Sequence, residues 1–393
     1  MMERKIKINN GKVILADKII PNGTVLVENG MIAGVEEGNV DFADALVIDA
    51  KGNYISPGFV DIHVHGGGGH DFMDGTEEAF LKVAEIHAQH GTTSIMPTTL
   101  TAEKEDILHT LEIYEKANLN NNRGASFIGM HLEGPYFSMA QRGAQDPKYI
   151  RDPEPSEYME ILTHSSSIKR WSAAPERKGA IEFGKVLCER SILPSMAHTD
   201  AVYEEAKNAF DNGYTLLTHF YSAMSGVTRK NASRYAGVIE AGYLHDTLDV
   251  EIIADGIHLP APLLKLIYKI KGADHTALIT DAMRGAGMPE GESILGNINS
   301  GIKVILEGGV AKMPDRSSFA GSVALADRLV RTMIKMAEVP LLDAIKMITA
   351  TPARIMKLND KIGSLKKGMD ADILVFNQDI EMKSIFIKGN QIK

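Results

Sequence analysis

The chain has 393 residues, of which 44% are hydrophobic and 24% are charged, a composition typical of globular rather than disordered proteins. Its formal net charge is −9, whereas nonspecific nucleic-acid binders usually carry a basic excess, so we expect no nucleic acid partner. No apolar run approaches the ~18 residues needed to span a bilayer, and we expect no membrane segment.

The chain contains one cysteine, Cys188. A single thiol excludes an intramolecular disulfide framework and a zinc site built on several thiolates, and it suits a reducing compartment. The first ten residues lack the apolar core and the small-residue cleavage site of a secretory signal. These observations predict a cytoplasmic protein.

The two ends of the chain share a pattern of short apolar runs separated by turn residues. Within residues 1–56, the dipeptides Asn22-Gly23 and Asn29-Gly30 predict tight hairpin turns. Residues 360–393 show the same alternation of apolar runs and turns. Because short two-stranded pieces are not stable alone, we expect both ends to join in one small β domain.

Residues 57–359 alternate apolar runs with amphipathic helical patterns. A helix predicted over 200–212 has Thr199 or Asp200 as its N-cap and ends at Gly213. Further helices are predicted at 76–90, 102–117 and 261–271. Eight candidate strands are 59–65, 93–98, 126–132, 168–174, 192–198, 215–220, 249–254 and 276–281. This alternation predicts an α/β protein with a (β/α)₈ barrel, and a doubly wound parallel sheet is the alternative.

Several polar residues lie at the carboxyl ends of these predicted strands. His63 and His65 end the first strand, and their spacing of two places both side chains on one face. The others are Glu133, His198, His219 and Asp281. Taken singly, each has a structural interpretation, as a core histidine or a turn carboxylate. Because active sites of barrels are built at that rim, their joint placement predicts a functional site.

The residue types of this cluster favour a metal site. Imidazoles and carboxylates suit Zn²⁺ or Fe²⁺, and no thiolate is needed. Such an ion lowers the pKa of a water molecule that it binds and polarises a carbonyl group. A neighbouring carboxylate can then move a proton. The cluster therefore predicts a metal site with a carboxylate beside it for proton transfer.

Two terminal motifs resemble those of the metal-dependent amidohydrolase superfamily: Ile-Ser-Pro-Gly-Phe-Val-Asp-Ile-His-Val-His at 55–65, and the closing segment at 363–374. Within that superfamily the chain resembles the N-acetylglucosamine-6-phosphate deacetylases, most specifically in His-Leu-Glu-Gly-Pro-Tyr-Phe at 131–137. The other similar segments are 197–200, 218–224, 254–258, 280–283 and 319–322.

The resemblance implies a barrel over residues 57–359 and a small β-sandwich domain built from 1–56 and 360–393. It implies a main metal ion, zinc or iron, with a second ion in some members of the family. The main ligands would be Glu133, His198 and His219, and the pair for a second ion would be His63 and His65.

The implied activity is hydrolysis of the N-acetyl group of N-acetyl-D-glucosamine 6-phosphate in amino-sugar catabolism, giving D-glucosamine 6-phosphate and acetate. Asp281 would be the catalytic acid/base, taking a proton from the attacking water and giving it to the leaving amine. The resemblance also implies substrate contacts from His258, from the Ala223 backbone, and from a 319–321 loop formed by Phe319, Ala320 and Gly321.

Three positions depart from the usual family pattern. Gln145, after Ala144, stands where some members have a histidine that polarises the acetyl carbonyl, and Ser222 replaces an asparagine near the phosphate. The family also uses an arginine from a neighbouring subunit, for which Arg229 and Arg234 are the candidates here. That arginine implies a homodimer.

These departures leave alternatives open. One is a deacetylase for a related N-acetylhexosamine phosphate such as the galactosamine epimer. Another is an N-acyl amino acid deacylase or cyclic amidase, although such sites often use a carboxylated lysine after the fourth strand and Lys169 opens that strand. A noncatalytic homologue is expected to lose ligands, and this chain keeps all six positions.

Overall fold

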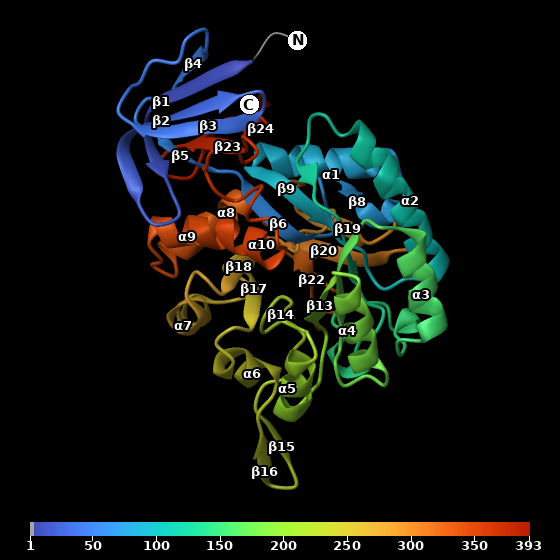
Figure 1. Cartoon of the computed structure of the whole chain (residues 1–393). Coiled ribbons are helices and arrows are strands. Elements are labelled where there is room, and N and C mark those ends of the chain that lie inside the picture. Colours follow the sequence, from blue (N-terminus) through green and yellow to red (C-terminus); the bar gives the residue numbers. More distant parts are fainter. Residues whose placement is uncertain (1–3) are drawn as a thin grey trace.

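A sheet built from both ends of the chain lies at one side of the molecule (Figure 1). The structure, a computed structural model, describes residues 4–393, except for the side chain of Lys230. The sheet has the order β25-β24-β23-β5-β1-β2-β3, with β4 paired to β1. Its strands are β1 (Lys5–Ile14), β2 (Ile19–Glu28), β3 (Met31–Glu37), β4 (Leu46–Asp49), β5 (Tyr54–Pro57), β23 (Ile373–Phe376), β24 (Met382–Ile387) and β25 (Asn390–Gln391).

The two chain ends meet where β5 pairs antiparallel with β23, in the register Ser56 to Leu374. One buried hydrophobic cluster draws on both ends, and it includes Ile8, Val25 and Phe386. The two β-rich ends thus belong to one sheet.

The turn predictions in this sheet have mixed outcomes. Asn29 and Gly30, with φ of 52° and 82°, connect β2 to β3 as predicted. The predicted turn at Asn22-Gly23 is wrong, because these residues lie inside β2. There Gly23 faces Gly11 where the pairing of β1 with β2 shifts register, so the dipeptide is accommodated at a bulge.

The middle of the chain contains parallel strands in two groups, ordered β10-β9-β6 and β11-β12-β13-β14-β17-β18. Single parallel bridges connect the two groups: Thr98, just after β9, pairs with His131 in β11, and Val64 in β6 pairs with Ala282, after β18. The predicted α/β class with parallel strands is confirmed. The bounds are β6 (Phe59–Val64), β9 (Thr92–Pro97), β10 (Ser126–Phe127), β11 (Met130–Glu133), β12 (Ile168–Ala173), β13 (Leu193–Met196), β14 (Leu216–Leu217), β17 (Asp249–Ile253) and β18 (Thr276–Ile279).

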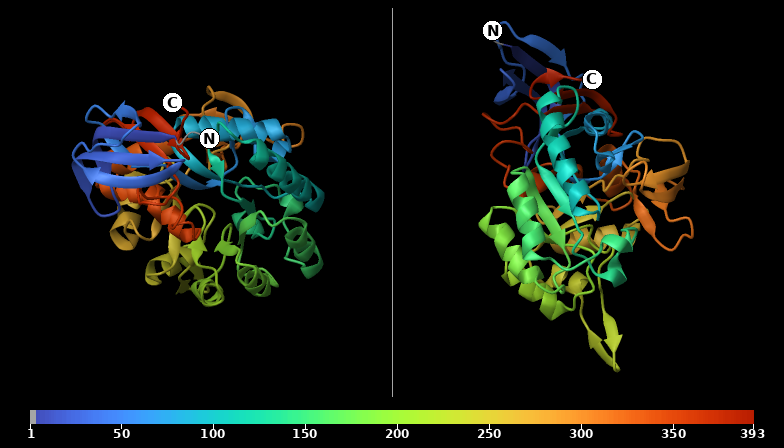
Figure 2. Two further views of the ribbon diagram at one scale, coloured as in Figure 1. Left: turned by 45° about the horizontal axis from the view of Figure 1, so that its top comes forward. Right: turned by 90° about the vertical axis from the view of Figure 1, so that its right-hand side faces the viewer.

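Helices lie outside these strands in Figures 1 and 2. The α-helices are α1 (Glu77–Gln89), α2 (Lys104–Asn120), α3 (Pro155–His164), α4 (Ala180–Glu189), α5 (Tyr203–Asp211), α6 (Val238–Leu244), α7 (Ala261–Lys271), α8 (Ala326–Lys335), α9 (Leu341–Ile348) and α10 (Ala350–Ile355). Short 3₁₀ helices are η1 (Phe72–Asp74), η2 (Met139–Gln141) and η3 (Pro147–Tyr149). Among the described helices, none is both long and apolar enough to cross a membrane.

The predicted cap of α5 is wrong. The N-cap is Val202, whose N–H donates to Glu205 at 2.9 Å. Thr199 and Asp200 are used elsewhere, because the Thr199 hydroxyl and the Asp200 N–H both donate to the Glu176 carboxylate at 2.6 Å.

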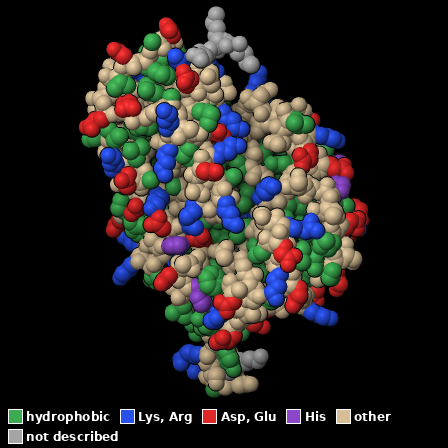
Figure 3. Space-filling model, viewed as in Figure 1, with side chains coloured by type: hydrophobic (Ala, Val, Ile, Leu, Met, Phe, Trp, Pro, Cys, Tyr) green, Lys and Arg blue, Asp and Glu red, His purple; other side chains and the backbone are tan. Residues whose placement is uncertain are grey.

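Three small antiparallel units interrupt the helix–strand alternation. A four-stranded sheet, in the order β19-β20-β21-β22, follows β18; it comprises β19 (Gly291–Leu295), β20 (Ile302–Glu307), β21 (Val310–Lys312) and β22 (Phe319–Ser322). The expected 319–321 loop is therefore part of an edge strand. A hairpin of β15 (Thr228–Lys230) and β16 (Ser233–Tyr235) projects from the body in Figures 2 and 3. A short pair, β7 (Gly66–Gly67) and β8 (His70–Asp71), precedes η1.

Candidate active site

Three of the predicted site residues follow the ends of parallel strands in an unusual backbone conformation. His198 comes after β13, His219 after β14 and Asp281 after β18. Their φ angles are 46°, 36° and 46°, in the left-handed region that non-glycine residues rarely adopt. Such conformations concentrate at functional sites, where the surrounding structure holds them in place.

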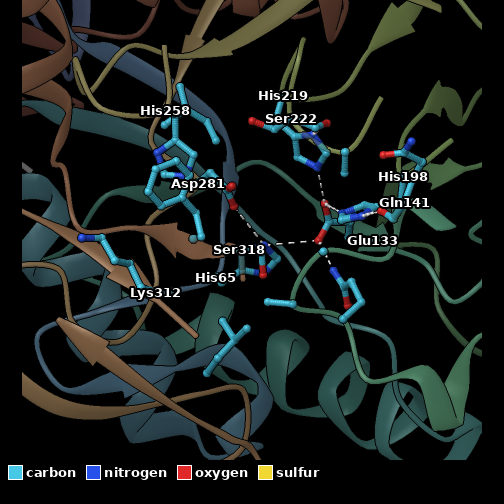
Figure 4. A pocket seen from close by; sticks show the side chains of 18 of the residues that line it. His65, Glu133, Gln141, His198, His219, Ser222, His258, Asp281, Lys312 and Ser318 are labelled. Atoms are coloured by element: carbon cyan, nitrogen blue, oxygen red, sulfur yellow. Dashed lines mark hydrogen bonds and ion pairs between the residues drawn. The ribbon is translucent and has the colours of Figure 1, made fainter. Parts of the chain in front are cut away.

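The carboxylate of Glu133, at the end of β11, lies among four imidazoles, of which Figure 4 labels His65, His198 and His219. Its Oε1 is 3.0 Å from Nε2 of His219, 3.4 Å from Nε2 of His63 and 3.5 Å from Nε2 of His198. Its Oε2 is 3.4 Å from Nε2 of His65. All five side chains are buried. The structure thus brings five of the six strand-end residues into direct contact.

Asp281 completes the cluster on the other side of the histidine pair. Its Oδ1 lies 3.2 Å from Nε2 of His65 and 3.4 Å from Nε2 of His63. Figure 4 shows Asp281 and Glu133 on either side of His65. A carboxylate in this place can exchange a proton with a group bound between it and Glu133.

Burial and charge act against each other in this cluster. Although burial raises it, the pKa of Glu133 lies well below its usual range because His63 and the other imidazoles favour the charged carboxylate. The pKa of Asp281 is lowered for the same reason, with His63 and His65 opposing burial. Conversely, burial lowers the pKa of His65, but Asp281 and Glu133 raise it well above its usual value. The imidazoles therefore favour the charged form of both carboxylates.

The donor set fits a divalent metal ion. Two groups of donor atoms lie within 4.8 Å of one another: His63, His65 and Glu133, and Glu133, His198 and His219. Both consist of imidazole nitrogen and carboxylate oxygen, which suits borderline divalent ions. Nδ1 of His198 and Nδ1 of His219 meet the carbonyl oxygens of Gln141 and Ser222 at 2.8 and 3.1 Å, which leaves each Nε2 facing Glu133.

A pocket of about 800 Å³ opens above this cluster. Its metal-site end is formed by His65, Glu133, His198, His219 and Asp281. The predicted substrate contacts that also line it are Ala144, Gln145, Ser222, Ala223, His258, Phe319 and Gly321. The pocket therefore extends from the candidate metal site to His258, and it is large enough for a small-molecule ligand.

His258 is positioned by its neighbours at the far end of this pocket. Its Nδ1 lies 2.8 Å from Asp255 Oδ2, and its ring packs on Phe319 with 4.6 Å between the ring centroids. Because Asp255 engages Nδ1, the other ring nitrogen is left to meet a ligand.

The structure places three predicted substrate residues outside this lining. Ala320 is fully buried beside it, in β22. Arg229 and Arg234 are exposed and lie opposite each other in the β15–β16 hairpin, away from the pocket of their own chain.

Gln145 has a defined place in the site. Its Nε2 donates to Glu133 Oε2 at 2.7 Å, and its Oε1 accepts from the backbone N–H and the hydroxyl of Thr101, each at 2.9 Å. The amide is thus fixed in one orientation against the Glu133 carboxylate. Lys169 is exposed at the start of β12, and its Nζ donates to the carbonyl oxygen of Ser166, so it stands apart from the cluster.

Sequence reasoning missed two cations that line the pocket, Lys312 at the end of β21 and Arg316 in the turn before β22. Both pair with Glu307, at 3.3 and 3.1 Å. It also missed Arg170 and Glu251, charged residues beneath the cluster in strands β12 and β17. For Glu251, a charge between the apolar neighbours Val250 and Ile252 of a predicted buried strand was a signal that could have found it, whereas Arg170 follows Lys169 and gives no such signal.

The fold and the site define a class: an α/β protein with a histidine–carboxylate centre, suited to a divalent metal, at the carboxyl ends of parallel strands. Comparison with known proteins gives the family. Residues 54–392 match the amidohydrolase family, and the chain belongs to it. The resemblance predicted from the motifs is thereby confirmed.

Individual relatives are similar over almost the whole chain. An N-acetylgalactosamine-6-phosphate deacetylase of Escherichia coli O157:H7 is 32% identical, covering 92% of this chain and 93% of the relative. An N-acetylglucosamine-6-phosphate deacetylase of Vibrio furnissii is 30% identical, covering 99% and 94%. Among solved structures, a variant of the N-acetyl-D-glucosamine-6-phosphate deacetylase of Mycobacterium smegmatis, in complex with N-acetyl-D-glucosamine-6-phosphate, has a TM-score of 0.90 at 27% identity, covering 99% of both chains.

Proposed function

We propose that this protein is a metal-dependent deacetylase that hydrolyses the N-acetyl group of N-acetyl-D-glucosamine 6-phosphate to D-glucosamine 6-phosphate and acetate. The observation that carries the proposal is the shared carboxylate of Glu133, which belongs to both metal-binding groups and faces a pocket ending at His258. Membership of the amidohydrolase family and the names of the relatives support the same reaction.

The proposed architecture is a closed (β/α)₈ barrel over residues 57–359, with a β-sandwich domain from 1–56 and 360–393. The two bridges that link the parallel groups support closure. The pairing of β5 with β23 supports a terminal domain shared by both chain ends. In this arrangement the active site lies at the carboxyl rim of the barrel.

Glu133, His198 and His219 would hold the main ion, zinc or iron, and His63 and His65 with Glu133 would hold a second. A bound divalent ion would polarise the acetyl carbonyl and lower the pKa of a water molecule. Asp281 Oδ1 is placed to accept a proton from the attacking water and then to donate it to the amine nitrogen of the leaving sugar. The Gln145 amide, fixed by Thr101, would orient the Glu133 carboxylate and the acetyl group.

The phosphate is proposed to lie at the His258 end of the pocket. His258, Ser222 and Ala223 all belong to the pocket lining and would contact the phosphate, with the backbone N–H of Ala223 as a donor, and Phe319 and Gly321 would contact the sugar. A cation is needed there as well, because phosphate is best bound by charged donors.

The proposed homodimer supplies this cation from the partner subunit, whose β15–β16 hairpin would enter the pocket. The support is that Arg229 and Arg234 project on an exposed hairpin, outside the pocket of their own chain. Lys312 and Arg316 are the alternative within one chain.

A pair of variants separates the two sources of the cation. We expect the double variant Arg229→Met, Arg234→Met to raise KM for the phosphorylated sugar about 10- to 100-fold with little change in kcat, since hydrogen bonds to charged groups contribute roughly 1.5–3 kcal/mol. The matched control, Arg316→Met, should leave KM unchanged. A rise in KM only in the Arg316→Met enzyme would place the phosphate contact within one chain. Steady-state acetate release measures both.

The proposed function itself is tested by acetate release from metal-reconstituted protein. We expect strong preference for N-acetylglucosamine 6-phosphate over its galactosamine epimer and over the unphosphorylated sugar. Preference for the galactosamine compound would move the specificity to the second candidate, which the name of the E. coli relative favours. Absence of turnover on all three would contradict the deacetylase proposal.

A further inference from the structure

A buried ion pair lies directly beneath the candidate metal site. Arg170 in β12 and Glu251 in β17 are both fully buried. Their contact is bidentate: Arg170 Nη1 donates to Glu251 Oε2 and Nη2 donates to Oε1, each at 2.7 Å. Glu251 Oε1 also lies 3.0 Å from Nδ1 of His63. The strands β12 and β17 carry no candidate ligand themselves. The ion pair connects them to His63, one of the candidate metal-binding histidines.

Arg170 uses its remaining donors on the strands that carry other ligands. It donates to the carbonyl oxygen of Ile62 at 3.2 Å, to the Thr218 hydroxyl at 2.8 Å and to the Ser195 hydroxyl at 3.0 Å. Ile62 precedes His63, and Thr218 precedes His219. One guanidinium thus fixes the backbone or a side chain next to two candidate ligands.

Stability alone is a weak reason for such a pair, because replacing both partners of a buried ion pair by apolar residues is often neutral or stabilising. The position of the pair beside His63 explains its presence better. When Nδ1–H of His63 donates to Glu251, the lone pair of Nε2 is free, and Nε2 faces Glu133 Oε1 and Asp281 Oδ1 at 3.4 Å.

His63 differs from the other three imidazoles in this respect. Nδ1 of His198 and Nδ1 of His219 meet carbonyl oxygens, and Nδ1 of His65 has no hydrogen-bond partner among the described residues. A carboxylate partner raises the basicity of a metal-binding imidazole and fixes its tautomer and ring orientation.

We propose that Glu251, held by Arg170, is a positioning residue that orients His63 and thereby sets the affinity of the His63–His65–Glu133 group for a divalent metal ion. The inference rests on the proposed function insofar as that group binds metal, and it concerns residues outside the proposed ligand set.

The test is Glu251→Gln, with Zn²⁺ or Co²⁺ titrated into the metal-free protein and followed by calorimetry and by the Co²⁺ absorption spectrum. We expect metal affinity to fall about 10- to 100-fold for at least one ion per chain, the usual effect of losing such a partner. The matched control is Asp249→Asn, on the same strand, where Asp249 is also buried and bidentate to an arginine, Arg354. Its metal affinity should equal that of the wild-type protein.

The variant Glu251→Gln leaves Arg170 without its carboxylate and can be unstable for that reason. The double variant Arg170→Met, Glu251→Met removes both charges, so it should fold and still bind metal weakly. Wild-type affinity in either folded variant, or an equal loss in Asp249→Asn, would overturn the inference. These outcomes would leave the proposed function unaffected. The proposed function is contradicted by a different result, namely that the wild-type protein binds no metal or releases no acetate.

Discussion

Replacing Asp281 by asparagine is expected to lower kcat for acetate release about 10²- to 10⁴-fold, the usual contribution of a positioned acid/base. The amide has nearly the same shape as the carboxylate but cannot accept a proton from the attacking water. Asp281 stands outside both metal-binding groups, so metal content and the thermal unfolding midpoint should stay close to those of the wild-type protein. Steady-state kinetics and metal analysis of the same preparation measure the two quantities.

The matched control for this experiment is Asp327→Asn. Asp327 is also paired with a histidine, since its Oδ1 lies 3.1 Å from Nδ1 of His90, but it lies in α8 outside the pocket lining. We expect its kcat to be unchanged. Turnover by Asp281→Asn at a rate near that of the wild-type enzyme would contradict the assignment of Asp281 as the acid/base.

The convergence of these side chains could be predicted from the sequence because each one follows the end of a strand in a parallel sheet. Glu133, His198 and Asp281 each stand where an apolar run ends, and parallel strands bring such positions to one edge of the sheet. Local pattern and chain order together therefore placed side chains that are far apart in sequence.

Features that depend on a distant partner were beyond that reasoning. Glu251 contacts His63 across 188 positions, and Arg170 contacts Glu251 across 81. The strand pattern around Glu251 marks it as an unusual charge, but it does not indicate which residue meets it. Arg316 lines the pocket because it lies in the connection between the antiparallel strands β21 and β22. This antiparallel unit interrupts the regular alternation of strands and helices on which the strand predictions relied.

Local competition explains the smaller errors. Thr199 is a good N-cap by residue type, but its hydroxyl binds Glu176, and α5 begins at Tyr203 instead. Asn22-Gly23 suits a tight turn, but β2 continues through it because the pairing with β1 absorbs an irregularity there. In both cases tertiary contacts override the local preference.

The second large effect is expected for Glu133→Ala. Both metal-binding groups contain Glu133, so the variant should lose metal from both, by more than the roughly 10- to 100-fold that removal of an outer partner costs. Activity should fall with the metal content. Metal analysis after dialysis against a metal-free buffer measures the loss, and Glu176→Ala is the control, because Glu176 also binds near a strand end, at Thr199, but belongs to neither group.

Two further variants convert this experiment into a count of ions. His63→Ala disables only the group with His65, whereas His198→Ala disables only the group with His219. If two ions bind, each variant retains about half of the wild-type metal, and Glu133→Ala retains least, since its carboxylate serves both groups. If one ion binds, the His63→Ala variant keeps the full metal content of the wild-type protein, and the metal content of His198→Ala falls to that of Glu133→Ala. Full metal occupancy in Glu133→Ala would contradict the role of this residue under either count.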